Sequence, residues 1–148
     1  MSELKNKRII TIATTGAWPK KENNPNVPMT PAEIAEDVYE CWQAGAAMAH
    51  LHMRDENGNG TMDKNKFRET VELLRKNHPD CDIIINMTTS GALTANDEER
   101  KIHVKELRPE MASYDCGSMN WLNTSLFLNP PKFLEELGQH MQEWGVKP

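Results

Sequence analysis

The stretch Ala46–Met53, AAMAHLHM, is the most informative segment of the chain, because it is a short and largely apolar run followed by turn-forming residues. Runs of this length are typical of strands buried in a parallel sheet. Side chains alternate between the two faces of a strand, so His50 and His52 share one face while Leu51 and Met53 share the other. The stretch predicts a strand that packs its apolar face on helices and carries two imidazoles on the opposite face.

Strand-like runs and helical patterns alternate along the rest of the chain. Further strands are expected at Arg8–Thr14, Asp82–Met87 and Met111–Asp115, and helices at Thr30–Ala44, Lys64–Asn77, Thr94–Leu107 and Pro131–Trp144. The first helix has a strong start signal, with a threonine N-cap, a proline at the first helical position and a glutamate at the third. Such alternation of strands and helices predicts parallel strands joined by right-handed crossovers.

Two architectures fit this alternation, an open doubly wound sheet and a barrel. An open sheet of the nucleotide-binding type carries a glycine-rich phosphate loop after its first strand, and Thr15-Gly16-Ala17-Trp18 is not such a loop. The chain has 148 residues, whereas a complete (β/α)8 barrel has roughly 250. We predict an α/β fold that is the amino-terminal half of a (β/α)8 TIM barrel, with residues 1–148 as a single partial domain of four β/α units.

Composition excludes several classes of partner. The net charge of −5 disfavours nucleic acid, since binding to a phosphate backbone relies on clustered Lys and Arg. No stretch approaches the roughly 20 apolar residues that span a membrane, and Met1–Lys5 lacks the apolar core of a signal peptide. A cytoplasmic protein is expected. The three cysteines are too far apart for a metal knuckle and are expected to be reduced thiols; they are Cys41, Cys81 and Cys116.

The predicted strand ends carry the candidate site, because ligands of parallel α/β folds bind at the carboxyl ends of the strands. His50 and His52 present two nitrogens on one face, and such a pair can supply two ligands to a catalytic zinc, which needs a third protein ligand and an open position. Two hydrogen-bonded pocket histidines without metal remain the alternative at this stage.

The next two strands add polar groups. Strand alternation sends Asn86, Thr88, Ser113 and Asp115 to the same inner side, where the backbone nitrogen of Gly91 could join them in binding a substrate carboxylate. Alternatively, Thr88 and Ser113 cap the helices that follow their loops.

Three further residues lie beside these strand ends. We expect Arg54 and Asp55 to form an ion pair that fixes their loop. Trp18 is either a wall of the pocket or a residue of ordinary loop packing.

Taken as a set, several motifs resemble the β-keto acid cleavage enzymes, the family of the 3-keto-5-aminohexanoate cleavage enzyme of lysine fermentation. The similarity implies a TIM barrel that uses zinc to convert a β-keto acid and acetyl-CoA into acetoacetate and a new CoA thioester. The motifs occur in order along nearly the whole chain as Thr15-Gly16-Ala17, Asn24-Pro25-Asn26-Val27-Pro28, Thr30-Pro31-x-Glu33, His50-Leu51-His52-Met53-Arg54, Thr88-Thr89-Ser90-Gly91-Ala92 and Pro109-Glu110-Met111-Ala112-Ser113.

Carried over residue by residue, the resemblance implies that the two histidines bind zinc. It also implies that the keto acid site is lined by Thr88, Gly91, Ser113 and Asp115. Two positions depart from the lysine-pathway enzyme. Trp18 stands where that enzyme has a glutamate that recognises the substrate amine, and Asp115 stands where it has an asparagine. An aromatic wall cannot neutralise an ammonium, so a less polar β-keto acid is expected.

The family's third metal ligand, a glutamate, and a catalytic arginine and aspartate belong to the later part of the barrel, so the catalytic residues are expected beyond Pro148. A half barrel has open strand edges, which favour a homo-oligomer or a complementing carboxyl-terminal half, and the 148 residues alone are expected to be inactive. The rival hypotheses are a non-catalytic scaffold or binding half-domain and a metallohydrolase on the same barrel. A metal assay and acetyl-CoA-dependent turnover separate them.

Overall fold

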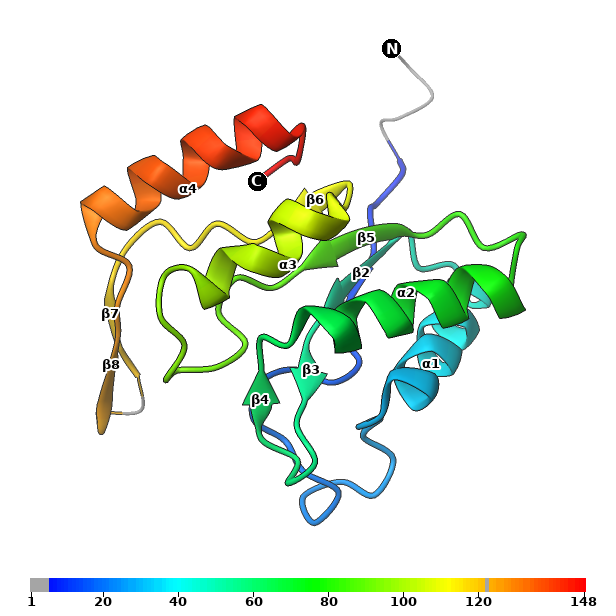
Figure 1. Cartoon of the computed structure of the whole chain (residues 1–148). Coiled ribbons are helices and arrows are strands. Elements are labelled where there is room, and N and C mark those ends of the chain that lie inside the picture. Colours follow the sequence, from blue (N-terminus) through cyan, green and yellow to red (C-terminus); the bar gives the residue numbers. More distant parts are fainter. Residues whose placement is uncertain (1–5, 122) are drawn as a thin grey trace.

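The computed structural model describes residues 6–121 and 123–148, and a four-stranded parallel sheet runs through it (Figure 1). The strands lie side by side in chain order. They are β1 (Thr11–Ile12), β2 (Met48–Leu51), β5 (Ile84–Met87) and β6 (Met111–Ala112). The predicted alternation of parallel strands and helices is confirmed, although β1 and β6 are shorter than the sequence predicts.

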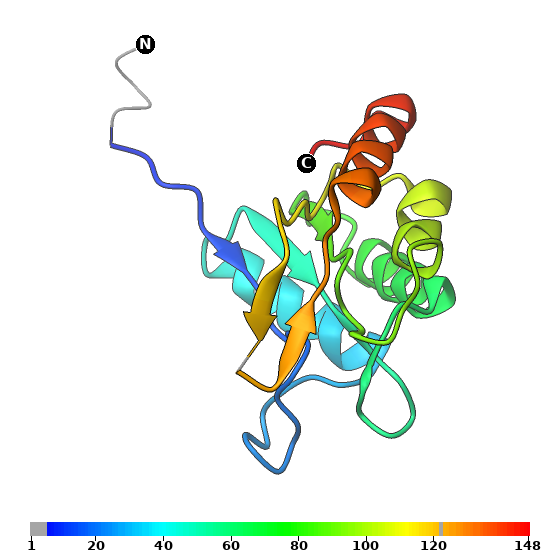
Figure 2. The same cartoon turned by 90° about the vertical axis from the view of Figure 1, so that its left-hand side faces the viewer.

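The helices connecting these strands lie on one face of the sheet, as Figures 1 and 2 show for α1, α2 and α3. Right-handed crossovers that always step in the same direction across a sheet place every helix on the same side. A doubly wound sheet reverses direction and covers both faces. The helices are α1 (Pro31–Gln43), α2 (Lys64–Asn77), α3 (Glu99–Leu107) and α4 (Pro131–Trp144).

The apolar core fills the space between this face and the helices. Leu51, Ile85 and Met87 point toward the helices and are buried with Phe67 of α2. A second cluster joins Ala112 of β6 to apolar side chains of α3 and α4. The alternate residues of the same strands, including His50 and Asn86, lie on the opposite face and are only half-buried. The packing therefore leaves that face of the sheet open.

Two antiparallel hairpins interrupt the repeat and were not indicated by the periodic pattern. The first pairs β3 (Met53–Arg54) with β4 (Gly60–Thr61), so the run predicted to end at Met53 continues into a hairpin. The second pairs β7 (Met119–Trp121) with β8 (Ser125–Phe127) between β6 and α4. Both hairpins lie in connections that follow strands of the main sheet.

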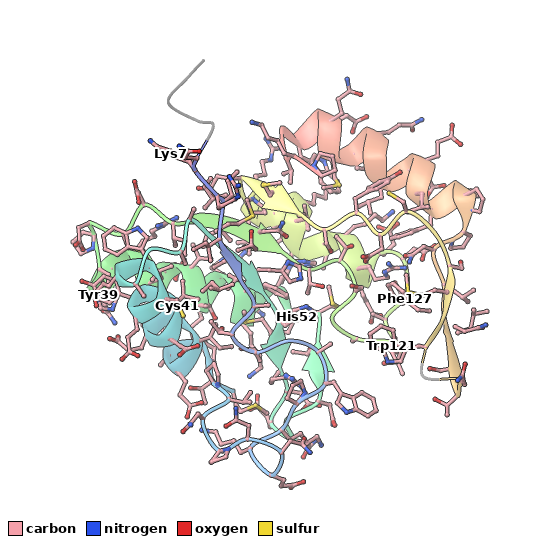
Figure 3. All side chains as sticks on the ribbon, turned by 180° about the vertical axis from the view of Figure 1, so that it is seen from behind. Lys7, Tyr39, Cys41, His52, Trp121 and Phe127 are labelled. Carbon is pink, nitrogen blue, oxygen red and sulfur yellow. The ribbon has the colours of Figure 1, made fainter. Side chains whose placement is uncertain are left out.

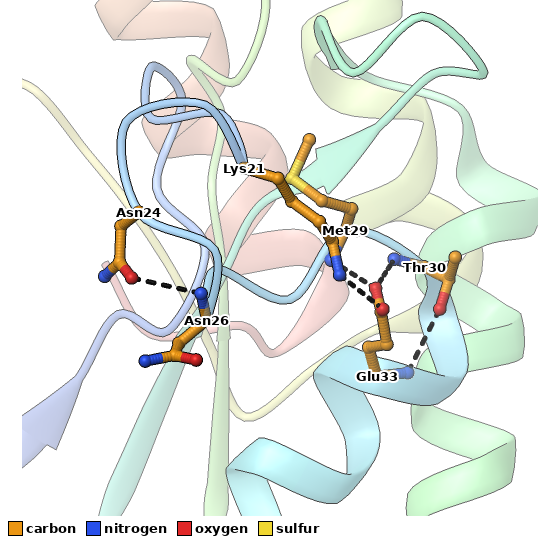
Figure 4. A network of polar contacts seen from close by, with 6 residues as sticks. All are labelled: Lys21, Asn24, Asn26, Met29, Thr30 and Glu33. Atoms are coloured by element: carbon orange, nitrogen blue, oxygen red, sulfur yellow. Dashed lines mark hydrogen bonds and ion pairs between the residues drawn. The ribbon is translucent and has the colours of Figure 1, made fainter.

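The start of α1 matches the prediction and extends into the preceding loop (Figure 4). Thr30 accepts the amide of Glu33, and the Glu33 carboxylate accepts the amides of Thr30 and Met29. Lys21 also donates to this carboxylate at 2.7 Å. These bonds hold the pKa of Glu33 at about 2, chiefly through Lys21. One carboxylate thus fixes both the helix start and the loop before it.

The start of α3 differs from the prediction. The sequence pattern places it at Thr94, whereas α3 begins at Glu99. The side chain of Asn96 accepts the amides of Glu98 and Glu99, and Glu99 accepts the amide of Asn96 in return. These reciprocal bonds cap the start of the helix at Asn96, two residues after the predicted cap Thr94.

The sheet also continues past β6. The sequence predicts no further strand after α4, but Lys147 forms a parallel bridge with Met111. Its amide donates to Glu110 and its carbonyl accepts from Ala112. Val146, just before it, is buried against α4. The chain therefore returns from α4 to the outer edge of β6, in the same direction of travel as the earlier crossovers.

Within the described residues no helix is long and apolar enough to cross a membrane. The three cysteines are unpaired, which confirms the expectation of free thiols; they are Cys41, Cys81 and Cys116.

Candidate functional site

The two candidate histidines lie together on the open face of the sheet. His50 stands opposite Asn86 in the register of β2 and β5, and His50 Nδ1 lies 2.9 Å from Asn86 Oδ1. The Nε2 atoms of His50 and His52 are 3.1 Å apart. Figure 3, viewed from behind Figure 1, labels His52 in this region. The prediction that these three side chains share one face is confirmed.

The hydrogen bonds define which nitrogens carry lone pairs. The Asn86 amide nitrogen faces Met48 Sδ, which leaves its oxygen to accept from Nδ1–H of His50. In neutral His50 the Nε2 atom then carries a lone pair, and His52 donates Nε2–H to it. Metal-binding histidines usually donate their remote ring N–H to an oxygen acceptor such as a carboxylate or a backbone carbonyl, and Asn86 Oδ1 is the acceptor of this kind for His50.

His52 is a half-buried imidazole beside two other basic side chains. Burial lowers its pKa to about 3, with smaller contributions from the neighbouring charges of His50 and Arg54. Its Nδ1 atom is buried and has no hydrogen-bond partner within the part of the chain that the structure describes. His52 is thus neutral at physiological pH, the state in which an imidazole acts as a ligand.

The loop after β5 is bound tightly to the start of the segment after β6. The amide of Thr89 donates to Ser113 Oγ at 2.9 Å, and Thr89 Oγ1 donates to the Ser113 carbonyl at 2.9 Å. Thr88 Oγ1 accepts the amide of Ser90 at 3.1 Å. Thr88 and Ser113 therefore shape this loop, and the alternative in which they cap helices is wrong.

Two side chains of α3 hold the same loop from behind, and sequence reasoning missed both. His103 Nε2 lies 2.7 Å from the Thr88 carbonyl, and Arg100 Nε donates to the Thr89 carbonyl at 2.7 Å. His103 is 0% exposed and stacks on Phe67. Burial lowers its pKa to about 4, although the bond to Thr88 opposes this shift. The neutral ring therefore donates Nε2–H, which fixes the first carbonyl of the loop.

Gly91 lies against the β3–β4 hairpin. A Cβ atom placed on Gly60 would lie 2.0 Å from the Gly91 carbonyl oxygen and 3.6 Å from that of Ala17. No side chain fits at that approach, so Gly60 is what allows three strand-exit segments to meet. The loops after β1 and β5 and the hairpin after β2 therefore converge at Gly60.

The expected ion pair between Arg54 and Asp55 is wrong. Arg54 is 2% exposed and donates to the carbonyls of Thr15, Pro19 and Gly58. Asp55 instead accepts the amides of Asn57 and Asn59 and closes the turn of the hairpin. The two charges serve different loops because one points inward and the other follows the turn.

Asp115 and Trp18 lie outside the strands of the main sheet, on the segments that follow β6 and β1. β6 ends at Ala112, so strand alternation does not extend to Asp115 as predicted. One oxygen of its half-buried carboxylate is enclosed and lacks a partner among the described residues, and its charge acts on Arg100. Trp18 is 65% exposed on the loop after β1, next to Ala17. Its indole is therefore not buried in the loop, and a role as a wall of the pocket stays a prediction.

His50 and His52 are the residues that could hold a metal together. Within residues 6–121 and 123–148, no group of three or more His, Cys, Asp or Glu side chains is arranged to hold a metal ion. This part of the protein therefore offers two ligands, and a closed coordination shell needs a group from elsewhere.

The chain is similar to several known proteins. The family model described as beta-keto acid cleavage enzyme matches residues 7–148. The 3-keto-5-aminohexanoate cleavage enzyme of Fusobacterium nucleatum is 42% identical over 96% of this chain and 51% of its own length. The 3-oxoadipate:acetyl-CoA acetyltransferase of Cupriavidus necator is 35% identical over 95% of this chain and 48% of its own. The chain thus spans about half the length of these relatives.

A solved structure supports the same relationship. The structure named as apo ObcA superposes with a TM-score of 0.73 at 26% identity, covering 84% of this chain and 30% of ObcA. ObcA has also been solved in a ternary complex with a C4-CoA adduct and oxalate, at a TM-score of 0.71. With a family model matching almost every residue, the chain belongs to the β-keto acid cleavage enzyme family.

Proposed function

We propose that this chain forms the amino-terminal half of a (β/α)8 barrel, as one partial domain, in a zinc-dependent β-keto acid cleavage enzyme. The complete enzyme would convert a β-keto acid and acetyl-CoA into acetoacetate and a new CoA thioester. The observation that carries the proposal is the 3.1 Å approach of His50 Nε2 and His52 Nε2 on the open face of the sheet.

The one-sided arrangement of the helices supports a barrel. Four parallel strands in chain order, all crossing in one direction, curve toward closure when the same step is repeated. Lys147 begins that next step at the edge of β6. The relatives are about twice as long as this chain, which leaves room for the strands that would close the sheet.

The distance within the histidine pair supports zinc. Zn–N bonds of about 2.0–2.1 Å in a tetrahedral site put two ligand nitrogens about 3.4 Å apart. The pair already approaches that separation, and Asn86 orients His50 from behind. Bound zinc would supply Lewis-acid polarisation of the ketone oxygen. We propose that the third ligand, a glutamate, and the groups that handle the proton come from the remaining half.

The chain's own residues would bind and orient the keto acid. We propose that its carboxylate meets the loop after β5, with Thr88, Gly91 and Ser113 defining the position of that loop. The Thr88 hydroxyl is buried and held by Ser90, so its contribution is to fix the backbone. His103 and Arg100 hold two carbonyls of the loop, which keeps it from rearranging during the reaction.

Trp18 supports a substrate without a positive charge. Its exposed indole, on the loop after β1, would offer an apolar surface in place of a counterion for an ammonium. Asp115 adds a carboxylate on the β6 side, near Arg100. We therefore propose a β-keto acid that carries no positively charged group, cleaved in the cytoplasm.

The test is acetyl-CoA-dependent turnover. The chain is combined with zinc, a β-keto acid without an amino group, acetyl-CoA and the carboxyl-terminal half of a related barrel, and acetoacetate is measured. Turnover should require acetyl-CoA, the added half and metal, and should stop on chelation. Acetyl-CoA-independent hydrolysis would show instead a metallohydrolase, and metal-independent turnover would contradict the role of zinc.

A further inference from the structure

Arg54 is one of two buried arginines among the described residues whose hydrogen bonds end only on uncharged acceptors. It is 2% exposed, and its three hydrogen bonds all end on uncharged backbone carbonyls. A buried cation is normally paired with an acid because desolvation of the charge is costly. Burial accordingly lowers the pKa of Arg54. A buried cation of this kind lowers the free energy of unfolding. Its presence is explained if the geometry that it imposes is needed.

The geometry that Arg54 imposes concerns the loop after β1. A single nitrogen, Nη2, donates to the Thr15 carbonyl at 3.2 Å and to the Pro19 carbonyl at 2.9 Å. These two carbonyls flank Gly16, Ala17 and Trp18, and Gly16 has φ 62°, which bends the backbone. Both ends of this three-residue lobe therefore converge on one atom, and Trp18 is presented outward.

The other terminal nitrogen joins this lobe to the hairpin. Arg54 Nη1 donates to the Gly58 carbonyl at 3.1 Å, in the turn between β3 and β4. The same hairpin carries Gly60, which abuts the carbonyls of Gly91 and Ala17. The guanidinium thus links the Trp18 lobe to the hairpin that meets the loop after β5.

We propose that Arg54 is a positioning residue that sets the orientation of Trp18 on the loop after β1. The effect of this orientation on substrate selection rests on the proposed function. The positioning of Trp18 by Arg54 does not depend on that function. A guanidinium is needed because it is planar and donates in fixed directions to several acceptors. A lysine at this position has a single nitrogen on a flexible chain. It cannot donate at the same time to the carbonyls that Nη2 binds and to the carbonyl that Nη1 binds.

The chain contains a matched control. Arg100 is a second buried arginine, 6% exposed, and it ties the Thr89 carbonyl to Leu128 and Asn129 at the end of the β7–β8 hairpin. It acts on the loops after β5 and β6 and makes no bond to the lobe that carries Trp18. Arg100→Lys therefore disturbs a comparable buried cation at the other pair of loops.

The experiment records amide and indole NMR spectra of the full chain, without metal or substrate, for wild type, Arg54→Lys and Arg100→Lys. Trp18→Phe identifies the Trp18 indole signal. Arg54→Lys should move or broaden that signal and the amides of residues 15–18 and Gly58, while the indoles of Trp42 and Trp144 stay in place. Arg100→Lys should move Thr89 and Asn129 and leave Trp18 unchanged.

Two results overturn the proposal. One is an unchanged Trp18 signal in Arg54→Lys, and the other is an equal displacement of Trp18 in both variants. If Arg54→Lys does not fold, the wild-type spectrum decides. The Arg54 Nη protons should exchange slowly and show couplings to the carbonyl carbons of Thr15 and Pro19, and rapid exchange overturns the proposal. Because no readout is turnover, failure here and failure of the proposed function are separate results.

Discussion

His50 Nε2 and His52 Nε2 lie 3.1 Å apart, and the hydrogen bond from His52 to His50 occupies the lone pair that a metal would use. A metal ion that enters must break this bond, and His52 must carry its proton on Nδ1 instead of Nε2 before each ring offers a lone pair at Nε2. His50 is already restrained by Asn86, whereas His52 Nδ1 has no partner among the described residues. The two rings are therefore unequal in how firmly they are oriented.

Zinc binding should depend on both rings. Replacing either histidine by alanine should weaken zinc binding by more than the about 10–100-fold that loss of a supporting residue costs. The double variant should bind no zinc above background by isothermal titration and elemental analysis. His78→Ala is the control, because His78 pairs with Glu36 on α1, away from the site. Unchanged metal content in the double variant would refute the ligand assignment.

Asn86 should contribute through orientation alone. Asn86→Ala removes the acceptor for His50 Nδ1–H and should lower zinc affinity about 10–100-fold, with the stoichiometry unchanged. Asn57→Ala, in the exposed turn of the first hairpin, should leave the affinity at the wild-type value. Equal affinities of wild type and Asn86→Ala would exclude a supporting role.

The buried His103 should make stability depend on pH. Its pKa is about 4 in the folded chain and 6.5 when exposed, so the unfolded chain binds a proton between these values and the folded chain does not. Stability should therefore be complete above pH 6.5 and decrease as the pH falls toward 4, by about 3 kcal/mol. His103→Gln should remove the share of this slope that comes from His103 in urea titrations and leave the share of His52, whose pKa is also lowered, whereas His78→Gln should retain both. A wild-type slope in His103→Gln would contradict the assignment.

Two glycine substitutions should change the stability of the folded chain in opposite directions. Gly60→Ala forces a Cβ onto the Gly91 carbonyl and should cost about 1–3 kcal/mol of stability. Gly138→Ala, inside α4, meets only Tyr114 at 3.5 Å or more and should gain about 0.5–1 kcal/mol. Denaturation midpoints measure both. A neutral Gly60→Ala would mean that the hairpin and the loop after β5 move apart freely.

Trp18 should determine the choice of substrate in the completed enzyme. Trp18→Glu places a carboxylate where an ammonium can be neutralised, so the ratio of kcat/KM for an amino β-keto acid over the analogue without the amino group should rise. Trp18→Phe keeps an apolar ring and should leave this ratio near its wild-type value. A wild-type preference for the amino substrate would show that Trp18 does not exclude it.

The parts of the fold that the sequence predicts are those set by local pattern. The alternation of His50, Leu51, His52 and Met53 predicts which side chains face the helices, and the packing of Leu51 and Met53 agrees. The capping of α1 is predicted for the same reason, since Thr30, Pro31 and Glu33 are neighbours in the chain.

The clamps around the site depend on contacts between distant residues. Arg54 bonds to residues 35 and 39 positions away, and nothing in its own neighbourhood distinguishes this from an ion pair with Asp55. The buried positions of α3 include Arg100, Lys101 and His103, so an apolar stripe could not mark the face that supports the loop. The hairpins were missed because strands of two or three residues are too short to show a period.

The bridge between Lys147 and Met111 makes the two ends of the sheet unequal. Among the described residues β1 pairs only with β2, so its outer backbone groups are available to any strand of suitable length. The outer edge of β6 is already engaged by residues that follow α4, and a competing strand would have to displace them. Pairing at that edge also fixes register, and a slip by one residue would turn the inner side chains outward. Mispairing between copies should therefore start at β1, whereas correct growth of the sheet is templated at β6.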